Sequence, residues 1–172
     1  MKLIGAAHRP ISVMPFSFAV CAAIGMAIQG SPQTVPDPIG DLIKATKLSY
    51  ADITGLYKLS YIIDEKRKQT IYVRKETHDY RSLKVNEVYS LVWESPNAMP
   101  ADQLTTTFLT RLGIGGLIYE QPSEAQKLYR IRFRLTVPIS LNPEAAKEYF
   151  NAVAVTGDAL EAALNPGAED RF

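Results

Sequence analysis

The stretch LYRIRFRLTV, residues 128–137, carries the clearest strand signal in the chain. Large apolar side chains stand at its odd positions, and Arg130, Arg132 and Arg134 stand between them. Because successive side chains of a β-strand point to opposite faces, this alternation predicts a strand with one face in the core. The three arginines fall together on the other face. They are either a binding surface for a partner or the solvated side of a sheet.

Four further segments have the composition of strands. They are YKLSYIID and QTIYVRKE (57–64 and 69–76, a hairpin around the turn EKRK), EVYSLVWE (87–94) and GLIYEQ (116–121). HDYRSLKVN (78–86) lacks a consistent alternation, and it is expected to be a long irregular connection between the second and third strands.

Three segments combine helical spacing of apolar residues with capping residues at their start. They are 38–51 after Asp37, a helix from about Pro100 with a stripe of Leu104, Phe108, Leu109 and Leu112, and 143–164 after Asn142. Short links between neighbouring strands favour antiparallel pairing. The predicted fold is therefore α+β, an antiparallel sheet of about five strands with helices on one face, in the order α-β-β-β-α-β-β-α.

The domain organisation follows from the composition of the two ends. Residues 1–30 have a short basic head followed by the charge-free apolar run 11–28, which predicts an export signal. An uncleaved membrane anchor over 11–28 is the first alternative, and a buried helix is the second. The first two interpretations place the rest of the chain outside the cytoplasm, periplasmic or secreted. A linker (31–37), a single domain (38–165) and a C-terminal tail (166–172) complete the chain.

Charge and cysteine content exclude several classes of function. The 172 residues include 19 basic and 18 acidic ones, and two of the basic residues lie in the first 30, which leaves 17 basic against 18 acidic residues in the remainder. Such a chain has no bulk attraction to nucleic acid or to an anionic membrane. The only cysteine, Cys21, lies in the predicted export segment, so no disulfide or thiolate site is expected in the remainder. We expect contact with a membrane only through an uncleaved N-terminal segment.

Few residues suggest chemistry. His78 is the only histidine outside the first 30 residues, and no HxxxH pairing exists, so we expect no catalytic residue, no metal and no cofactor. The glycines of GIGG (113–116) follow a predicted helix and lead into a strand, which favours a helix end and a turn over a phosphate loop. An enzyme that uses paired carboxylates is the remaining catalytic alternative.

The predicted strands are rich in charged and aromatic residues. Acidic residues on neighbouring strands are expected to neutralise the three arginines across the sheet. These acids are Asp64, Glu76, Glu87, Glu94 and Glu120. The aromatic rings of the strands are expected to pack against the helices and the sheet edges, with partner binding as the alternative. These rings belong to Tyr57, Tyr61, Tyr72, Tyr89, Trp93, Tyr119 and Tyr129.

The order of elements over 38–165 resembles the YbjN-like proteins, which share the fold of type III secretion chaperones. The resemblance is carried by the strands from LYKLSYII to VYSLVWE, the helix PADQLTTTFLTRL and above all the C-terminal block YRIRFRLTVPISLNPEAAKEYFNAVAVTGDALEAAL. It implies a non-enzymatic module that works through protein contacts, often as a homodimer. The chain differs from secretion chaperones in its predicted export signal and its nearly neutral charge.

The expected function is that of an exported, non-enzymatic protein-binding module that forms a homodimer through its sheet, with an unknown protein partner. Arg130, Arg132 and Arg134 form the candidate partner-binding face, and reversing the charge of Arg132 is expected to leave folding nearly intact. The alternative is a periplasmic small-ligand-binding or sensory domain, with a pocket between sheet and helices that uses tyrosine hydroxyls.

Overall fold

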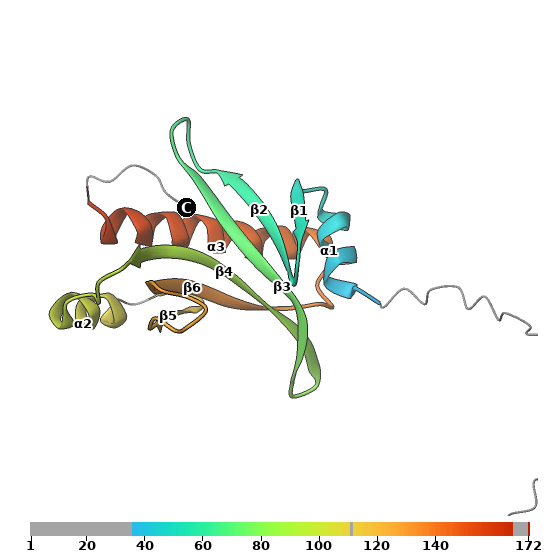
Figure 1. Ribbon diagram of the computed structural model, residues 1–172. Helices are drawn as coiled ribbons and strands as arrows, with labels where there is room; N and C mark the ends of the chain where they lie inside the picture. Colours follow the sequence, from blue (N-terminus) through green and yellow to red (C-terminus); the bar gives the residue numbers. More distant parts are fainter. Residues whose placement is uncertain (1–35, 111, 167–171) are drawn as a thin grey trace, which may run out of the picture. The chain divides into compact units, whose positions relative to one another are not determined.

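The computed structural model describes residues 36–110, 112–166 and 172. The helices and strands in chain order are α1 (Pro38–Thr46), β1 (Tyr50–Ile53), β2 (Leu56–Ile62), β3 (Lys68–Tyr80), β4 (Leu83–Ser95), α2 (Ala101–Leu109), β5 (Gly116–Glu120), β6 (Tyr129–Pro138) and α3 (Pro143–Leu164). Figure 1 shows the resulting α+β arrangement, a six-stranded antiparallel sheet in the order β1-β2-β3-β4-β6-β5 with three helices. The predicted export segment, 1–30, lies outside the described residues. Within them, no helix has the length and apolar character needed to cross a membrane.

The sheet has one strand more than the sequence predicted. The helix expected over 38–51 ends at Thr46, because Lys47 adopts a left-handed backbone conformation with φ of 59°. The chain then turns back as β1, which pairs antiparallel with β2. Tyr50, which falls within the predicted helix, lies in this strand instead, and its ring is edge-on to that of Tyr57 with centroids 5.5 Å apart.

The expected irregular connection over 78–86 is also wrong, because β3 and β4 continue through it and turn at Arg81 and Ser82. In Figure 1 this hairpin projects beyond the rest of the sheet. A projecting two-stranded arm has solvent on both faces, so its sequence lacks an apolar alternation. Its base is fixed by the fully buried Asn86, whose Nδ2 donates to the carbonyl oxygens of residues 74–76 at distances of 2.9 to 3.3 Å.

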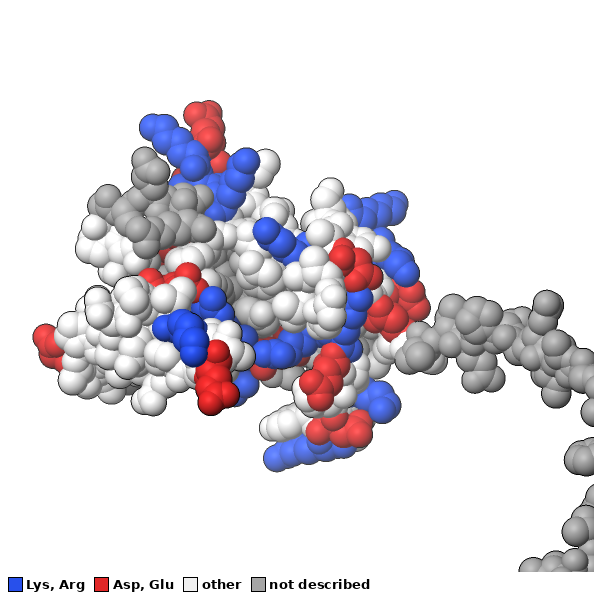
Figure 2. Space-filling view, viewed as in Figure 1, with Lys and Arg blue, Asp and Glu red and all other residues white. Residues whose placement is uncertain are grey.

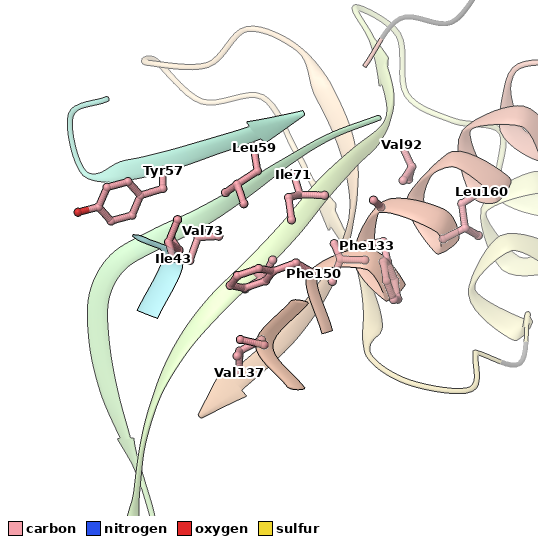
Figure 3. Packing of buried hydrophobic residues seen from close by; sticks show 14 of the residues in the cluster. Ile43, Tyr57, Leu59, Ile71, Val73, Val92, Phe133, Val137, Phe150 and Leu160 are labelled. Atoms are coloured by element: carbon pink, nitrogen blue, oxygen red, sulfur yellow. The ribbon is translucent and has the colours of Figure 1, made fainter. Parts of the chain in front are cut away.

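The helix-covered face of the sheet holds the core. α3 packs on β3, β4 and β6, and α1 lies against α3 and β3. The alternation of β6 is confirmed, since Ile131, Phe133 and Val137 are fully buried on this face. Figure 3 shows Phe133 and Val137 with Phe150 of α3 in one continuous cluster. α3 begins as predicted, with the Asn142 side chain accepting a hydrogen bond from the backbone of Ala145.

A small polar layer lies where α3 crosses the middle of the sheet. Gln69 and Ser90 are fully buried, and Gln69 Nε2 donates to Ser90 Oγ, which in turn donates to the carbonyl of Thr70 at 3.0 Å. Gly157 lies directly over them, and a Cβ at that position would be 2.8 Å from Ser90 Cβ. The helix therefore approaches β4 too closely for any residue larger than glycine at this point.

Candidate functional site

The three arginines of β6 lie on the face of the sheet opposite to α3, which we call the outer face. Each forms an ion pair with a glutamate of a neighbouring strand. The pairs are Arg130 with Glu94 (Nε to Oε2, 2.6 Å), Arg132 with Glu120, and Arg134 with Glu87 (3.4 Å). The expectation that acids from neighbouring strands neutralise the arginines is met by these three glutamates, two on β4 and one on β5.

The other two acids do not pair with these arginines. Asp64 closes the turn after β2, where its Oδ1 accepts the backbone amides of Lys66 and Arg67 at 2.8 and 2.9 Å. These hydrogen bonds lower the pKa of the Asp64 carboxyl. Glu76 lies 3.9 Å from the ring of His78, at the exposed base of the β3–β4 arm. No group of three or more metal-ligating side chains occurs among the described residues, His78 included.

Two tyrosines share the outer face with the arginines. Tyr72 of β3 is directly opposite Tyr89 of β4, and their rings stack with centroids 5.2 Å apart. The guanidinium carbon of Arg132 lies 4.5 Å from the centroid of Tyr89, within the range of a cation–π contact. Burial raises the pKa of the Tyr89 hydroxyl, and the nearby arginines oppose this only in part.

The expectation that strand rings pack against the helices and the edges holds for several of them but fails for Tyr72 and Tyr89. Tyr57 is buried in the core, and Tyr61 and Trp93 pack against it. Tyr119 and Tyr129 stack on each other at 5.9 Å, on the last two strands of the sheet. The arginine-bearing strand itself carries no ring on the outer face. The rings come from β3 and β4, and only the register between strands brings them there.

A shallow hollow of about 190 Å³ lies between these rings and the arginines. Its lining residues are Tyr72, Tyr89, Leu91, Glu120, Arg130 and Arg132. The side chain of Arg132 is only 14% exposed, and its Nε is buried with no hydrogen-bond acceptor among the described residues. The hollow is smaller than the roughly 300–1,000 Å³ of typical small-molecule pockets, so it fits a single side chain. Because Arg132 is largely buried opposite Glu120, reversing its charge would destabilise the sheet rather than leave folding intact.

A second surface lies at α2 and the neighbouring edge of the sheet. The predicted stripe of α2 does not all face the core: Leu104 is half-buried, whereas Phe108 is 43% and Leu109 75% exposed. These side chains and Tyr119 of β5 line a groove of about 420 Å³ with Thr105. We call Phe108, Leu109, Ile114 and the free edge of β5 the α2–β5 surface. Figure 2 shows that the region of α2 is nearly free of charge.

The two edges of the sheet differ. β1 has only four residues, and its Asp52 forms an ion pair with Lys75. Short strands and charged side chains protect an edge against pairing with another chain. β5, at the other end of the strand order, has the sequence GLIYE, without lysine or proline. β5 is only one residue longer than β1, and its one charged residue, Glu120, pairs with Arg132 of β6, so the protective features that this edge lacks are lysine and proline.

The glycines of 113–116 form the turn into β5, as expected, and not a phosphate loop. α2 ends at Leu109 with Thr110 as its cap, so the glycines do not cap the helix. Gly115 has φ of 72°, and a Cβ there would be 2.4 Å from the carbonyl oxygen of Arg134. A glycine is needed at this position because the turn lies directly against β6.

No family model, no curated protein and no solved structure matches this chain. The resemblance to YbjN-like proteins stays a prediction.

Proposed function

We propose that this chain is an exported protein-binding module that acts without catalysis and self-associates through the α2–β5 surface. The observation that carries the proposal is an exposed apolar helix face next to a sheet edge that has neither lysine nor proline. The export signal predicted over 1–30 would place the module in the periplasm or outside the cell.

The first support is the energetics of α2. The helix has nine residues, and a helix of this length is marginal in water unless tertiary packing stabilises it. Leu109 nevertheless remains largely in solvent, and Phe108 is 43% exposed. Full burial of Leu109 against a partner would contribute up to about 1.5–3 kcal/mol, and full burial of Phe108 about half as much. A second protein surface would thus stabilise the helix and the complex together.

The second support is the geometry of β5. Two copies of an antiparallel edge strand can pair about a two-fold axis perpendicular to the sheet, which makes the same patch of each copy face itself. With Ile118 at the middle of β5, such pairing would continue the sheet from one copy into the other. Among the described residues that define the α2–β5 surface, none is basic, and the only acid is Glu120, which pairs with Arg132. Like-charge repulsion between the copies would therefore be small.

The test compares two substitutions of equal chemistry and exposure. Leu109→Asp changes a residue of the α2–β5 surface that is 75% exposed, and Ile62→Asp changes one on β2 that is 76% exposed. We expect the purified protein to be a dimer by sedimentation equilibrium and Leu109→Asp to weaken it by about 2 kcal/mol, about thirtyfold in Kd. Ile62→Asp should leave the dimer unchanged.

Two results would contradict the proposal. One is a purified protein that remains monomeric at high micromolar concentration. The other is equal weakening of the dimer by Ile62→Asp and Leu109→Asp, because the effect would then not belong to the α2–β5 surface. Thermal melts followed by circular dichroism would check that both variants are folded.

A further inference from the structure

We infer that the outer face binds an extended acidic segment of a partner protein and seats one of its carboxylate side chains in the hollow between Tyr72 and Arg132. The inference rests on the proposed protein-binding function and adds the chemical class of the partner. It uses a different surface from self-association, so the two can be measured separately.

The first argument is the segregation of charge. Strand register places six basic and four acidic residues on the outer face: Lys58, Lys68, Arg74, Arg130, Arg132, Arg134, Glu76, Glu87, Glu94 and Glu120. The face thus has a formal charge of +2. Of the 17 basic and 18 acidic residues after residue 30, this leaves 11 basic and 14 acidic, or −3, for the rest of the chain. In Figure 2, basic side chains lie across the middle of the view. Such a face attracts an acidic partner and orients its approach.

The second argument is the unequal sharing of carboxylates. Glu87 lies between two guanidinium groups, 3.3 Å from Arg74 and 3.4 Å from Arg134. A guanidinium has five N–H donors, so one carboxylate cannot satisfy both groups. The side chain of Arg134 is 50% exposed, and its remaining N–H groups can donate to a second carboxylate while the pair with Glu87 is kept.

The third argument is the preorganisation of Arg132. Its guanidinium is held over the ring of Tyr89 and against Glu120, which reduces the entropy lost on binding. Its buried Nε has no acceptor among the described residues. A small rotation of the guanidinium toward a ligand carboxylate would supply the missing hydrogen bond. A hollow the size of one side chain with an arginine and tyrosines in its wall is typical of an interface hot spot.

The spacing of the three arginines on β6, which we call the arginine ladder, favours an extended polypeptide as the ligand. Alternate residues on one strand are about 6.5–7 Å apart, so Arg130, Arg132 and Arg134 match acidic side chains at alternate positions of an extended chain. Single-stranded nucleic acid fits less well, because its continuous charge would meet four glutamates on the same face. Stacking of bases would also need free rings, whereas Tyr72, Tyr89 and Arg132 already stack on one another.

The probe is a fluorescein-labelled ten-residue peptide of alternating glutamate and threonine, titrated with the purified protein in low salt and followed by fluorescence anisotropy. Arg134→Gln should weaken binding about fivefold to tenfold. Lys147→Gln, an equal loss of charge at an exposed position of α3, should change it less than about twofold.

A second pair of variants separates the hollow from net charge. Tyr72→Leu keeps the charge but removes a ring from its wall, and it should weaken binding about fivefold. Tyr80→Leu, at the exposed tip of the β3–β4 arm, is the matched control and should have no effect. Leu109→Asp should bind the peptide as the wild type does, so that loss of the dimer and loss of peptide binding are distinguishable.

Three results would overturn the inference. The first is no binding of the peptide at millimolar protein concentration in low salt. The second is equal weakening by Lys147→Gln and Arg134→Gln, which would show that only net charge matters. The third is binding of ten-residue oligothymidylate or of vesicles containing anionic lipid in preference to the peptide, with the same dependence on Arg134.

Discussion

Replacing Gly157 by alanine tests the closest contact between α3 and the sheet. Helix propensity alone predicts that Gly157→Ala stabilises the protein, by about 1 kcal/mol at an interior helix position. The structure predicts the opposite, because the new Cβ would lie 2.8 Å from both Cβ and Oγ of Ser90. The Cβ of Ser90 is fixed to the backbone of β4 and cannot rotate away. Relief therefore requires a shift of the helix or the strand.

The magnitude follows from the two opposing terms. Forcing an extra carbon into a packed core costs about 1–3 kcal/mol. Subtracting the gain in helix propensity of about 1 kcal/mol leaves a net destabilisation of up to about 2 kcal/mol. In a Ser90→Gly background the obstructing atoms are gone, so the same substitution should stabilise by about 1 kcal/mol. The sign of the effect reverses between the two backgrounds.

Urea denaturation of the four proteins in this cycle measures the coupling directly. Ser90→Gly alone also removes the hydrogen bond of Ser90 Oγ to the carbonyl of Thr70, so each alanine variant must be compared with its own background. The coupling between the two positions should be about 1–3 kcal/mol. If Gly157→Ala stabilises both backgrounds equally, the close approach of α3 to β4 is refuted.

Two further predictions concern the arm and the tyrosines. Asn86→Ala should destabilise the protein by about 2 kcal/mol, because it removes the side-chain amide that donates to the carbonyl oxygens of residues 74–76. Hydrogen exchange of the backbone amides in the β3–β4 arm should become faster. Unchanged exchange rates would count against this role of Asn86. Burial raises the pKa of Tyr57, Tyr61 and Tyr89, so the stability due to their neutral hydroxyls is present below the usual tyrosine pKa of about 10 and is lost as the pH rises above it. Tyrosinate absorbance of these residues should appear only as circular dichroism reports unfolding, and complete ionisation of all nine tyrosines in a folded protein would refute this.

The elements that the sequence predicted well are those buried on one side. The alternation of β6 and the apolar spacing of α3 arise because each element has one face in the core and one in solvent. β1 escaped prediction because all four of its residues are exposed, so it has no apolar pattern. The tip of the β3–β4 arm, residues 79–84, escaped for the same reason. Both elements depend on pairing with a neighbouring strand, which a local pattern does not show.

The outer face could be predicted only in part. Charge and strand assignment predicted that acids on neighbouring strands pair with the arginines, but the register was needed to select Glu87, Glu94 and Glu120 from the five candidates. The place of Tyr72 and Tyr89 depends on register, and β3 contains an irregularity between Val73 and Thr77 that no sequence pattern indicated. The exposure of Leu109 was missed because an apolar stripe on a helix looks the same whether it meets the core or a partner.

The unequal edges of the sheet determine what kind of assembly the proposed self-association would produce. If β5 pairs with its own copy, that edge is no longer free, and the four-residue β1 edge with its ion-paired Asp52 remains at each end. Association would then stop at a closed dimer and not extend into a filament. A two-fold axis perpendicular to the sheet also keeps both outer faces on the same side. The dimer would present two arginine ladders on one continuous surface, and a partner with two acidic segments would bind it more tightly than either segment alone.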